Sequence, residues 1–193
     1  MAEDLRSVEV CSIPAPVLDP ITVFDPETEA IVARTGLRTF YGQLGHAPEA
    51  INGWMSFYQP LVSGGRVELR TKELCRLRVA ARNGCLFCLG GRFRGPDGEA
   101  VVSDDDVDAV LGGRLEDLRF SRRERAALRW TEVFRVDHST VDAALIAATL
   151  EHFSEAEFVE LAFCVAQFTG MGQLFAVLGI PSPVPAEPQP QSV

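Results

Sequence analysis

Helix-start signals recur along this chain, and each precedes an apolar pattern of helical period. Segments 121–124 (SRRE) and 154–157 (SEAE) match the capping box, in which a serine oxygen and a glutamate satisfy free amide donors of the first turn. Weaker starts of this kind stand at 103–106 and 139–142, and Pro48 suits the first turn of another helix. No segment alternates apolar and polar residues for long enough to predict a strand. We predict an all-α bundle of about eight helices with no significant sheet.

Length and composition indicate a single globular domain. The chain has 193 residues, of which 47% are apolar and 23% are charged, and both shares are close to the average for soluble globular proteins. Proline-rich stretches stand at both ends of the helical pattern. We therefore expect an extended arm over residues 1–25, the helical domain over 26–180 and a disordered tail over 181–193.

The net charge and the number of cysteines restrict the classes of partner and the cellular compartment that we expect. The chain carries 18 basic and 27 acidic residues, a net charge of −9, whereas binding to nucleic acid or anionic lipid requires a basic surface. We expect neither nucleic acid nor a membrane as partner. The N-terminal residues lack the pattern of a secretory signal and the cysteine count of five is odd, which predicts a reducing, cytoplasmic location. The uncharged stretch 161–180 contains two glutamines and three glycines, so we predict a buried core helix there.

The segment 68–94 carries the residues that suggest chemistry. Its first half has a helical pattern that ends at Asn83-Gly84, a dipeptide suited to terminating a helix. A second helix that begins near Cys85 places the Cys85-Leu-Phe-Cys88 motif in a first turn, where free amide donors favour a thiolate. The three-residue spacing lets the two sulfurs form a disulfide. The motif is therefore typical of a redox dithiol.

Charged residues are expected beside this dithiol. If the two helices form an antiparallel hairpin, Glu73 faces Arg92. Arg92 also follows Cys88 by four residues, which places both on one helical face. We predict a row of side chains, Glu73, Arg92, Cys88 and Cys85, in which the charged groups tune a thiolate.

Plainer interpretations stand beside these. Glu73 can instead pair with Arg70 or Arg76 of its own helix. Zinc requires four ligands and no second ligand pair follows the motif, so we expect no metal. Gly170 and Gly172 each destabilise a long helix by about 1 kcal/mol relative to alanine, and a close approach by another helix is the expected reason for them.

The spacing of Glu73, Cys85 and Cys88 resembles that of the carboxymuconolactone decarboxylase-like and AhpD-like superfamily, and the resemblance extends over about residues 36–181. It implies an all-α AhpD-like bundle and a CxxC site that acts as a thiol peroxidase or disulfide reductase. Cys88 matches the attacking cysteine, Cys85 the resolving cysteine and Glu73 the start of the proton relay. The relay histidine of the family falls on Arg92, and a guanidinium stays protonated, so it can stabilise a thiolate but cannot relay a proton.

The resemblance implies a thiol-dependent oxidoreductase that reduces a hydroperoxide or a disulfide without a cofactor. A lipoylated or thioredoxin-like protein is the expected dithiol reducing partner. His46 is a further candidate site residue, because its loop lies near the site in some members. The habit of the family and the apolar stretch 161–180 predict a homo-oligomer, either a trimer or a hexamer.

Two alternatives stay open. One is a cofactor-free decarboxylase acting on a small carboxylated lactone, in which Arg92 and His46 bind and protonate the substrate. The other is a non-enzymatic oligomer whose dithiol is a redox sensor, which is the expectation if the cysteine pKa lies near the free value of about 8.5.

Overall fold

The protein is described by a computed structural model over residues 15–183, so the first part of the predicted arm and most of the predicted tail lie outside the described residues. Within 15–183 the structure has nine α-helices, one 3-10 turn and no strand beyond an isolated bridge between Arg94 and Ala100, which confirms the all-α prediction. The elements are α1 (Pro26–Thr35), α2 (Arg38–Leu44), α3 (Pro48–Ser63), α4 (Leu69–Asn83), α5 (Leu86–Gly90), α6 (Asp104–Leu111), α7 (Arg122–Asp137), the 3-10 turn His138–Thr140, α8 (Ala143–Leu150) and α9 (Glu155–Val177).

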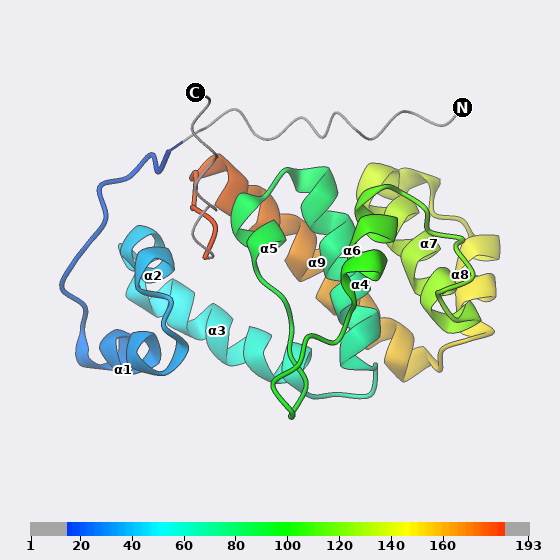
Figure 1. Cartoon of the computed structure of the whole chain (residues 1–193), viewed down its shortest axis with the longest axis horizontal. Helices are drawn as coiled ribbons and strands as arrows, with labels where there is room; N and C mark the ends of the chain where they lie inside the picture. Colours follow the sequence, from blue (N-terminus) through cyan, green and yellow to red (C-terminus); the bar gives the residue numbers. More distant parts are fainter. Residues whose placement is uncertain (1–14, 184–193) are drawn as a thin grey trace, which may run out of the picture.

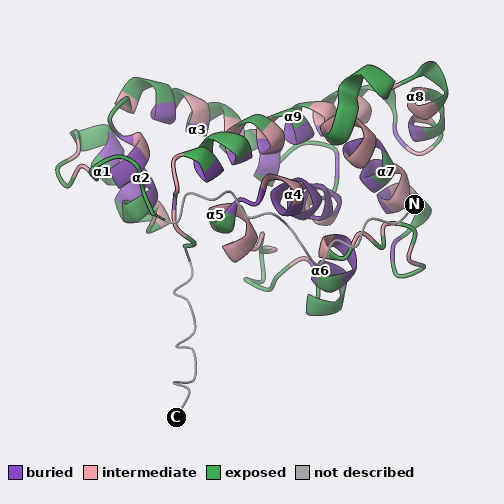
Figure 2. Ribbon diagram, turned by 90° about the horizontal axis from the view of Figure 1, so that it is seen from above, coloured by how far each residue is buried: buried purple, intermediate pink, exposed green. Residues whose placement is uncertain are grey.

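Helix α4 is the centre of the fold. It packs against α9, α7 and α6, and every residue from Thr71 to Ala81 is buried. Helices α1 to α3 lie at one end of the molecule and α7 and α8 at the other, with α9 running between them (Figure 1). In the view of Figure 2, α4 appears as a buried rod enclosed by the other elements. Any chemistry-bearing side chain on α4 is therefore shielded from bulk water.

Several buried residues of α4 are charged, and each of these has a partner from another element or from α4 itself. The Lys72 ammonium donates to the Leu61 and Gly64 carbonyls at the end of α3, at 2.8 and 2.6 Å, and lies 2.7 Å from the Glu160 carboxylate of α9. A buried charge without such partners would be strongly unfavourable. These contacts fix the position of α4 relative to α3 and α9.

The helix starts follow the capping signals closely. Ser121 and Ser154 each form the predicted capping box at α7 and α9. Ser103 forms a complete capping box as well, with Asp106 in place of glutamate. The predicted start at 139–142 is wrong, because that stretch begins as a 3-10 turn and Asp142 caps α8 instead. Pro48 is the first residue of α3, as predicted.

Helix α9 has one buried side and one exposed side. It has 23 residues, and an 18-residue window within it has a mean hydropathy of 1.3, so by length and composition alone it could cross a membrane, and it is the one such helix among the described residues. Its buried side packs against α4, whereas its other side is exposed (Figure 2) and carries apolar residues. The prediction of a core helix is therefore correct for one face only. The exposed apolar residues of α9 are Val159, Phe163, Leu174 and Val177.

Candidate functional site

The turn between α4 and α5 positions the two cysteines of the CxxC motif. Gly84 ends α4 with a φ of 60°, in the left-handed region that favours glycine. Cys85 then caps α5, and its sulfur accepts a hydrogen bond from the Cys88 backbone N–H at 3.2 Å. Cys85 is fully buried, whereas Cys88 is partly exposed. The two thiols therefore lie together, as predicted, but only Cys88 has an open side.

The pKa values of the two thiols are shifted in opposite directions. A hydrogen bond from the Cys88 side chain lowers the pKa of Cys85, and the Cys88 backbone N–H adds to this effect. The same side-chain contact raises the pKa of Cys88 well above its usual value, with burial as the second cause. When the reduced pair loses one proton, the negative charge therefore lies on Cys85 and the remaining proton on Cys88. The sequence had suggested the tuned thiolate at Cys88.

A buried ion pair lies directly behind the dithiol, on α4. Arg76 donates to both carboxylate oxygens of Glu73, from Nε at 2.6 Å and from Nη2 at 2.8 Å. The same guanidinium donates to the Cys88 carbonyl and, at 2.9 Å, to the Gly91 carbonyl. Glu73 also accepts the Phe93 backbone N–H at 3.2 Å. The pair thus binds the backbone that carries Cys88, and such bidentate pairs are among the strongest polar contacts.

The predicted contact between Glu73 and Arg92 is wrong. Helix α5 ends at Gly90, and Gly91 is extended, so Arg92 lies beyond the helix and does not share a helical face with Cys88. The Arg92 guanidinium instead donates to the Leu89 and Gly91 carbonyls, at 2.6 and 2.7 Å. Arg76 takes the place next to Glu73, as the plainer interpretation allowed. The two consecutive glycines are the sequence signal that indicates the early helix end.

His46 lies away from the dithiol. It is exposed at the end of α2, where its Nε2 is 2.9 Å from the Asp19 carbonyl oxygen. It is not among the residues that line the cavity beside Cys88. The described structure therefore brings together Glu73, Cys85 and Cys88, but it does not bring His46 to them.

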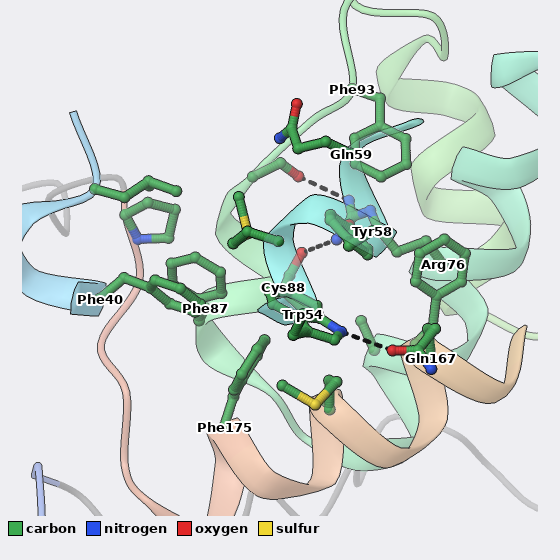
Figure 3. Close-up of a pocket in the computed structure, with 18 of the residues that line it drawn as sticks. Phe40, Trp54, Tyr58, Gln59, Arg76, Phe87, Cys88, Phe93, Gln167 and Phe175 are labelled. Atoms are coloured by element: carbon green, nitrogen blue, oxygen red, sulfur yellow. Dashed lines mark hydrogen bonds between the residues drawn. The ribbon is translucent and has the colours of Figure 1, made fainter. Parts of the chain in front are cut away.

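A cavity of about 260 Å³ opens beside Cys88 (Figure 3). Its wall comes from α2, α3, α4, α5, α9 and the segments after α5 and α9. Most of the lining is apolar and aromatic, which is typical of a pocket for a small organic molecule. The aromatic lining residues are Phe40, Trp54, Tyr58, Phe87, Phe93, Phe168 and Phe175.

Few polar groups face this cavity. Trp54 donates its indole N–H to the Gln167 side-chain oxygen at 2.6 Å (Figure 3). Arg76 reaches the wall beneath Cys88 and stacks on Phe93, with its guanidinium carbon 5.0 Å from the ring centroid. Tyr58 lines the cavity from α3. Tyr58 was missed by the sequence reasoning, because no motif marks it and only the fold brings α3 to α5.

One of the two glycines of α9 is required by the site. A Cβ added at Gly172 would lie 2.7 Å from the Asn83 side-chain nitrogen and 3.8 Å from the Cys88 sulfur, whereas one added at Gly170 would meet nothing within 4 Å. The predicted close approach is therefore confirmed at Gly172 and wrong at Gly170. Gly172 lets α9 pass directly beside the turn that carries the dithiol.

The other described cysteines are buried away from the cavity. Burial raises the pKa of Cys75 to about 12 and that of Cys164 to about 11. Both are therefore protonated and unreactive at neutral pH. Cys11 lies outside the described residues. Over residues 15–183 no group of three or more histidine, cysteine, aspartate or glutamate side chains is placed to hold a metal ion.

Comparison with known sequences finds one family model and a distant relative. The model of the carboxymuconolactone decarboxylase family matches residues 48–133, which include Glu73 and both cysteines of the motif. The uncharacterized protein YdfG of Bacillus subtilis (strain 168) is 24% identical over 134 residues, which are 69% of this chain and 89% of YdfG.

Solved structures with a similar fold include three of particular interest. An uncharacterized peroxidase-related protein from Silicibacter sp. TM1040 has a TM-score of 0.72 at 16% identity, covering 87% of this chain and 91% of its own. A peroxidase-related protein from Ralstonia eutropha JMP134, described as an alkylhydroperoxidase AhpD core, has a TM-score of 0.65 at 20% identity, covering 81% and 83%. A protein of unknown function from Agrobacterium tumefaciens has a TM-score of 0.60 at 21% identity, covering 73% and 95%.

Proposed function

We propose that this chain is a member of the carboxymuconolactone decarboxylase and AhpD-like superfamily, whose family model matches residues 48–133, and that it is a thiol-dependent oxidoreductase that reduces organic hydroperoxides or disulfides. The observation that carries the proposal is the placement of the CxxC pair. Cys88 forms part of the wall of an apolar cavity, and Cys85 lies buried directly behind it, in hydrogen-bond contact with the Cys88 backbone. A substrate in the cavity meets one sulfur, and the second is in place to resolve the product.

The proposed reaction transfers two electrons from the dithiol to the substrate. The Cys85 thiolate takes the proton of Cys88 while the Cys88 sulfur bonds to the terminal oxygen of the hydroperoxide and the O–O bond breaks. The alkoxide takes up one proton, which restores the proton that the reduced Cys85-Cys88 pair had released, and leaves as an alcohol, while Cys88 becomes a sulfenic acid. The Cys85 thiol then attacks the Cys88 sulfur and expels water. The sum is dithiol plus hydroperoxide giving disulfide, alcohol and water.

Glu73 and Arg76 act as positioning residues in this proposal. Arg76 holds the Cys88 and Gly91 carbonyls, and its fixed positive charge adds to the lowering of the Cys85 pKa and opposes the rise of the Cys88 pKa. Glu73 in turn fixes the guanidinium through two hydrogen bonds. The electrostatic support that the sequence assigned to Arg92 therefore comes from Arg76. Arg92, at the edge of the cavity, is left to contact the substrate.

The oxidised enzyme must be reduced again by a dithiol, such as a lipoylated or thioredoxin-like protein, and the cytoplasm is the compartment in which such partners keep thiols reduced. The decarboxylase alternative would need His46 and Arg92 to meet at one carboxylated substrate. His46 does not line the cavity, so no observation favours that alternative over the thiol chemistry.

The proposal is tested by mass spectrometry of the reduced full-length protein after addition of one equivalent of cumene hydroperoxide. We expect a loss of two hydrogens, mapped to a disulfide between Cys85 and Cys88, and no disulfide in Cys88→Ser. Cys164→Ala is the matched control, because it removes a buried thiol outside the cavity and should oxidise like the wild type. Full hydroperoxide consumption by Cys88→Ser would refute the proposal.

The same preparation separates the two alternatives. A decarboxylase would keep its activity after both thiols are alkylated. A redox sensor would be oxidised once and would not turn over with excess hydroperoxide and a small dithiol such as dihydrolipoamide. We expect repeated turnover that alkylation abolishes.

A further inference from the structure

Tyr58 lies on α3 and faces the same cavity as Cys88. Figure 3 shows Tyr58, Cys88 and Arg76 around one part of this space. The Tyr58 ring is stacked on Trp54, with ring centroids 4.5 Å apart. It also packs edge-on against Phe168, with ring centroids 6.4 Å apart. These contacts hold the ring in one orientation, so the position of its hydroxyl is fixed by the fold.

The Tyr58 hydroxyl has no hydrogen-bond partner within residues 15–183. Burial raises the pKa of Tyr58, the charges of Cys88 and Glu73 add to the rise, and Arg76 opposes it. Tyr58 lines one cavity with Cys88 and Arg76, and because burial raises its pKa, its hydroxyl stays protonated at neutral pH. The residue is half-buried in the cavity wall, so this donor is accessible to an acceptor that arrives with a ligand.

Three other donor side chains near Cys88 already form hydrogen bonds. The Trp54 N–H is bound to Gln167. All three nitrogens of Arg76 donate to Glu73 or to main-chain carbonyls. Arg92 is tied to two carbonyls of its own segment. The side-chain amides of Gln59 and Gln167 also line the cavity, but an amide N–H is too weak an acid to give up a proton, and among the described lining residues Tyr58 carries the one hydroxyl.

We propose that Tyr58 is a catalytic residue whose hydroxyl donates a hydrogen bond, and then its proton, to the oxygen that leaves when Cys88 attacks a hydroperoxide. This inference rests on the proposed function and adds the acid that the reaction requires. No histidine lies beside the dithiol in the described structure, because His46 is exposed elsewhere and His138 and His152 lie in or beside other elements, outside the cavity lining.

The step balances in protons and electrons. As the bond forms between the Cys88 sulfur and the terminal oxygen, the O–O bond breaks and its electron pair goes to the alkoxide. The alkoxide takes the Tyr58 proton and leaves as an alcohol. The resulting tyrosinate takes one proton from solvent, which replaces the proton that the reduced Cys85-Cys88 pair had released. Cys85 closes the disulfide and water leaves, as described above.

The chain contains two tyrosines, Tyr41 and Tyr58, and Tyr41 provides a matched control. The Tyr41 hydroxyl is buried without a hydrogen-bond partner, and burial raises its pKa as well. Tyr41 packs edge-on against Phe40 at 5.4 Å but does not line the cavity. Tyr41→Phe and Tyr58→Phe therefore remove the same group, and of the two residues Tyr58 is the one that lines the cavity with Cys88.

The test compares two oxidants that differ in their leaving group. Cumene hydroperoxide releases an alkoxide, which needs a proton, whereas peracetic acid releases acetate, which does not. For Tyr58→Phe we expect the rate of Cys88 oxidation by cumene hydroperoxide to fall by about 100-fold, the range of general-acid and oxyanion contributions. With peracetic acid it should fall by less than about threefold, since no proton has to be supplied. Tyr41→Phe should match the wild type with both oxidants.

Two outcomes would overturn the inference. One is an unchanged rate with cumene hydroperoxide, and the other is an equal loss with both oxidants, which would mean that Tyr58 only shapes the cavity. Cys88→Ser separates these results from a failure of the proposed function. If it consumes hydroperoxide like the wild type, the thiol mechanism itself is refuted and the role of Tyr58 with it.

Discussion

At the residue scale, Glu73 and Arg76 decide how the dithiol is held. The two side chains are almost fully buried, at 0% and 8% side-chain exposure, and the guanidinium bridges the carboxylate to the backbone of Cys88. Arg92 has only local contacts with main-chain carbonyls. Both arginines lie near Cys88, but only Arg76 neutralises a buried charge, so Arg76 contributes more to the stability of the fold than Arg92.

This difference predicts unequal effects of substitution. Arg76→Met leaves the Glu73 charge buried without a partner, so we expect a loss of about 3 to 5 kcal/mol in the free energy of unfolding. Arg92→Met should lose less than about 1 kcal/mol, because no buried charge is left unpaired. Urea unfolding followed by circular dichroism measures both.

A double variant provides the control for this prediction. Glu73→Gln combined with Arg76→Met removes the buried charge together with its partner, and it should recover part of the stability lost in Arg76→Met. Equal losses in Arg76→Met and Arg92→Met would contradict the assignment of the ion pair.

At the element scale, the helices that carry local signals were predictable and the contacts between them were not. Ser121 and Ser154 act within four residues, so the sequence alone locates the starts of α7 and α9. The two cysteines of the dithiol are three residues apart, so their proximity was also predictable from local sequence. The partner of Glu73 was not settled by local sequence, because it depended on whether α5 continues beyond Gly90. Tyr58 was out of reach, since it is 30 residues from Cys88 in the sequence and joins it only through packing.

The two glycines of α9 allow a test of packing at this scale. Gly170→Ala places a methyl group in open space, so we expect it to stabilise the protein by up to about 1 kcal/mol through helix propensity. Gly172→Ala forces a Cβ to within 2.7 Å of the Asn83 amide, so we expect a loss of about 1 to 3 kcal/mol from overpacking. Thermal unfolding of the two variants, which share chemistry and helix, gives the comparison.

The same pair also reports on the site. Asn83 donates to the Thr169 carbonyl at 3.1 Å and accepts from Arg135, so its displacement moves the end of α4 that leads into Cys85. Gly172→Ala should therefore slow Cys88 oxidation, while Gly170→Ala should not. Stabilisation by both substitutions would show that α9 does not pass as close to this turn as described.

At the scale of the whole molecule, an apolar surface lies along α9 and the neighbouring part of α3. Phe163 and Phe57 are 52% and 43% exposed, and their rings pack edge-on with centroids 6.1 Å apart. The stretch 161–180 contributes no charged residue to this surface. We propose that a second copy of the chain covers it, because an uncharged apolar face is complementary to itself and not to a charged partner.

Substitution at the centre of this surface tests the proposal. We expect light scattering after size exclusion to give a multiple of 21.1 kDa for the wild type, with a trimer or a hexamer as the predicted state, and a smaller species for Phe163→Glu. Leu118→Glu is the matched control, since Leu118 is 89% exposed but lies apart from α9, between α6 and α7. A wild-type protein that is monomeric at micromolar concentration would contradict the proposal.

The proposed mechanism requires that the substrate reacts with the Cys88 sulfur and that the buried Cys85 then resolves the product. The most direct measurement traps the sulfenic acid with dimedone after one equivalent of cumene hydroperoxide, in Cys85→Ser and in Cys88→Ser. The account predicts rapid and complete labelling of Cys88 in the Cys85→Ser variant and almost none of Cys85 in the Cys88→Ser variant. Faster labelling of Cys85 than of Cys88 would contradict it.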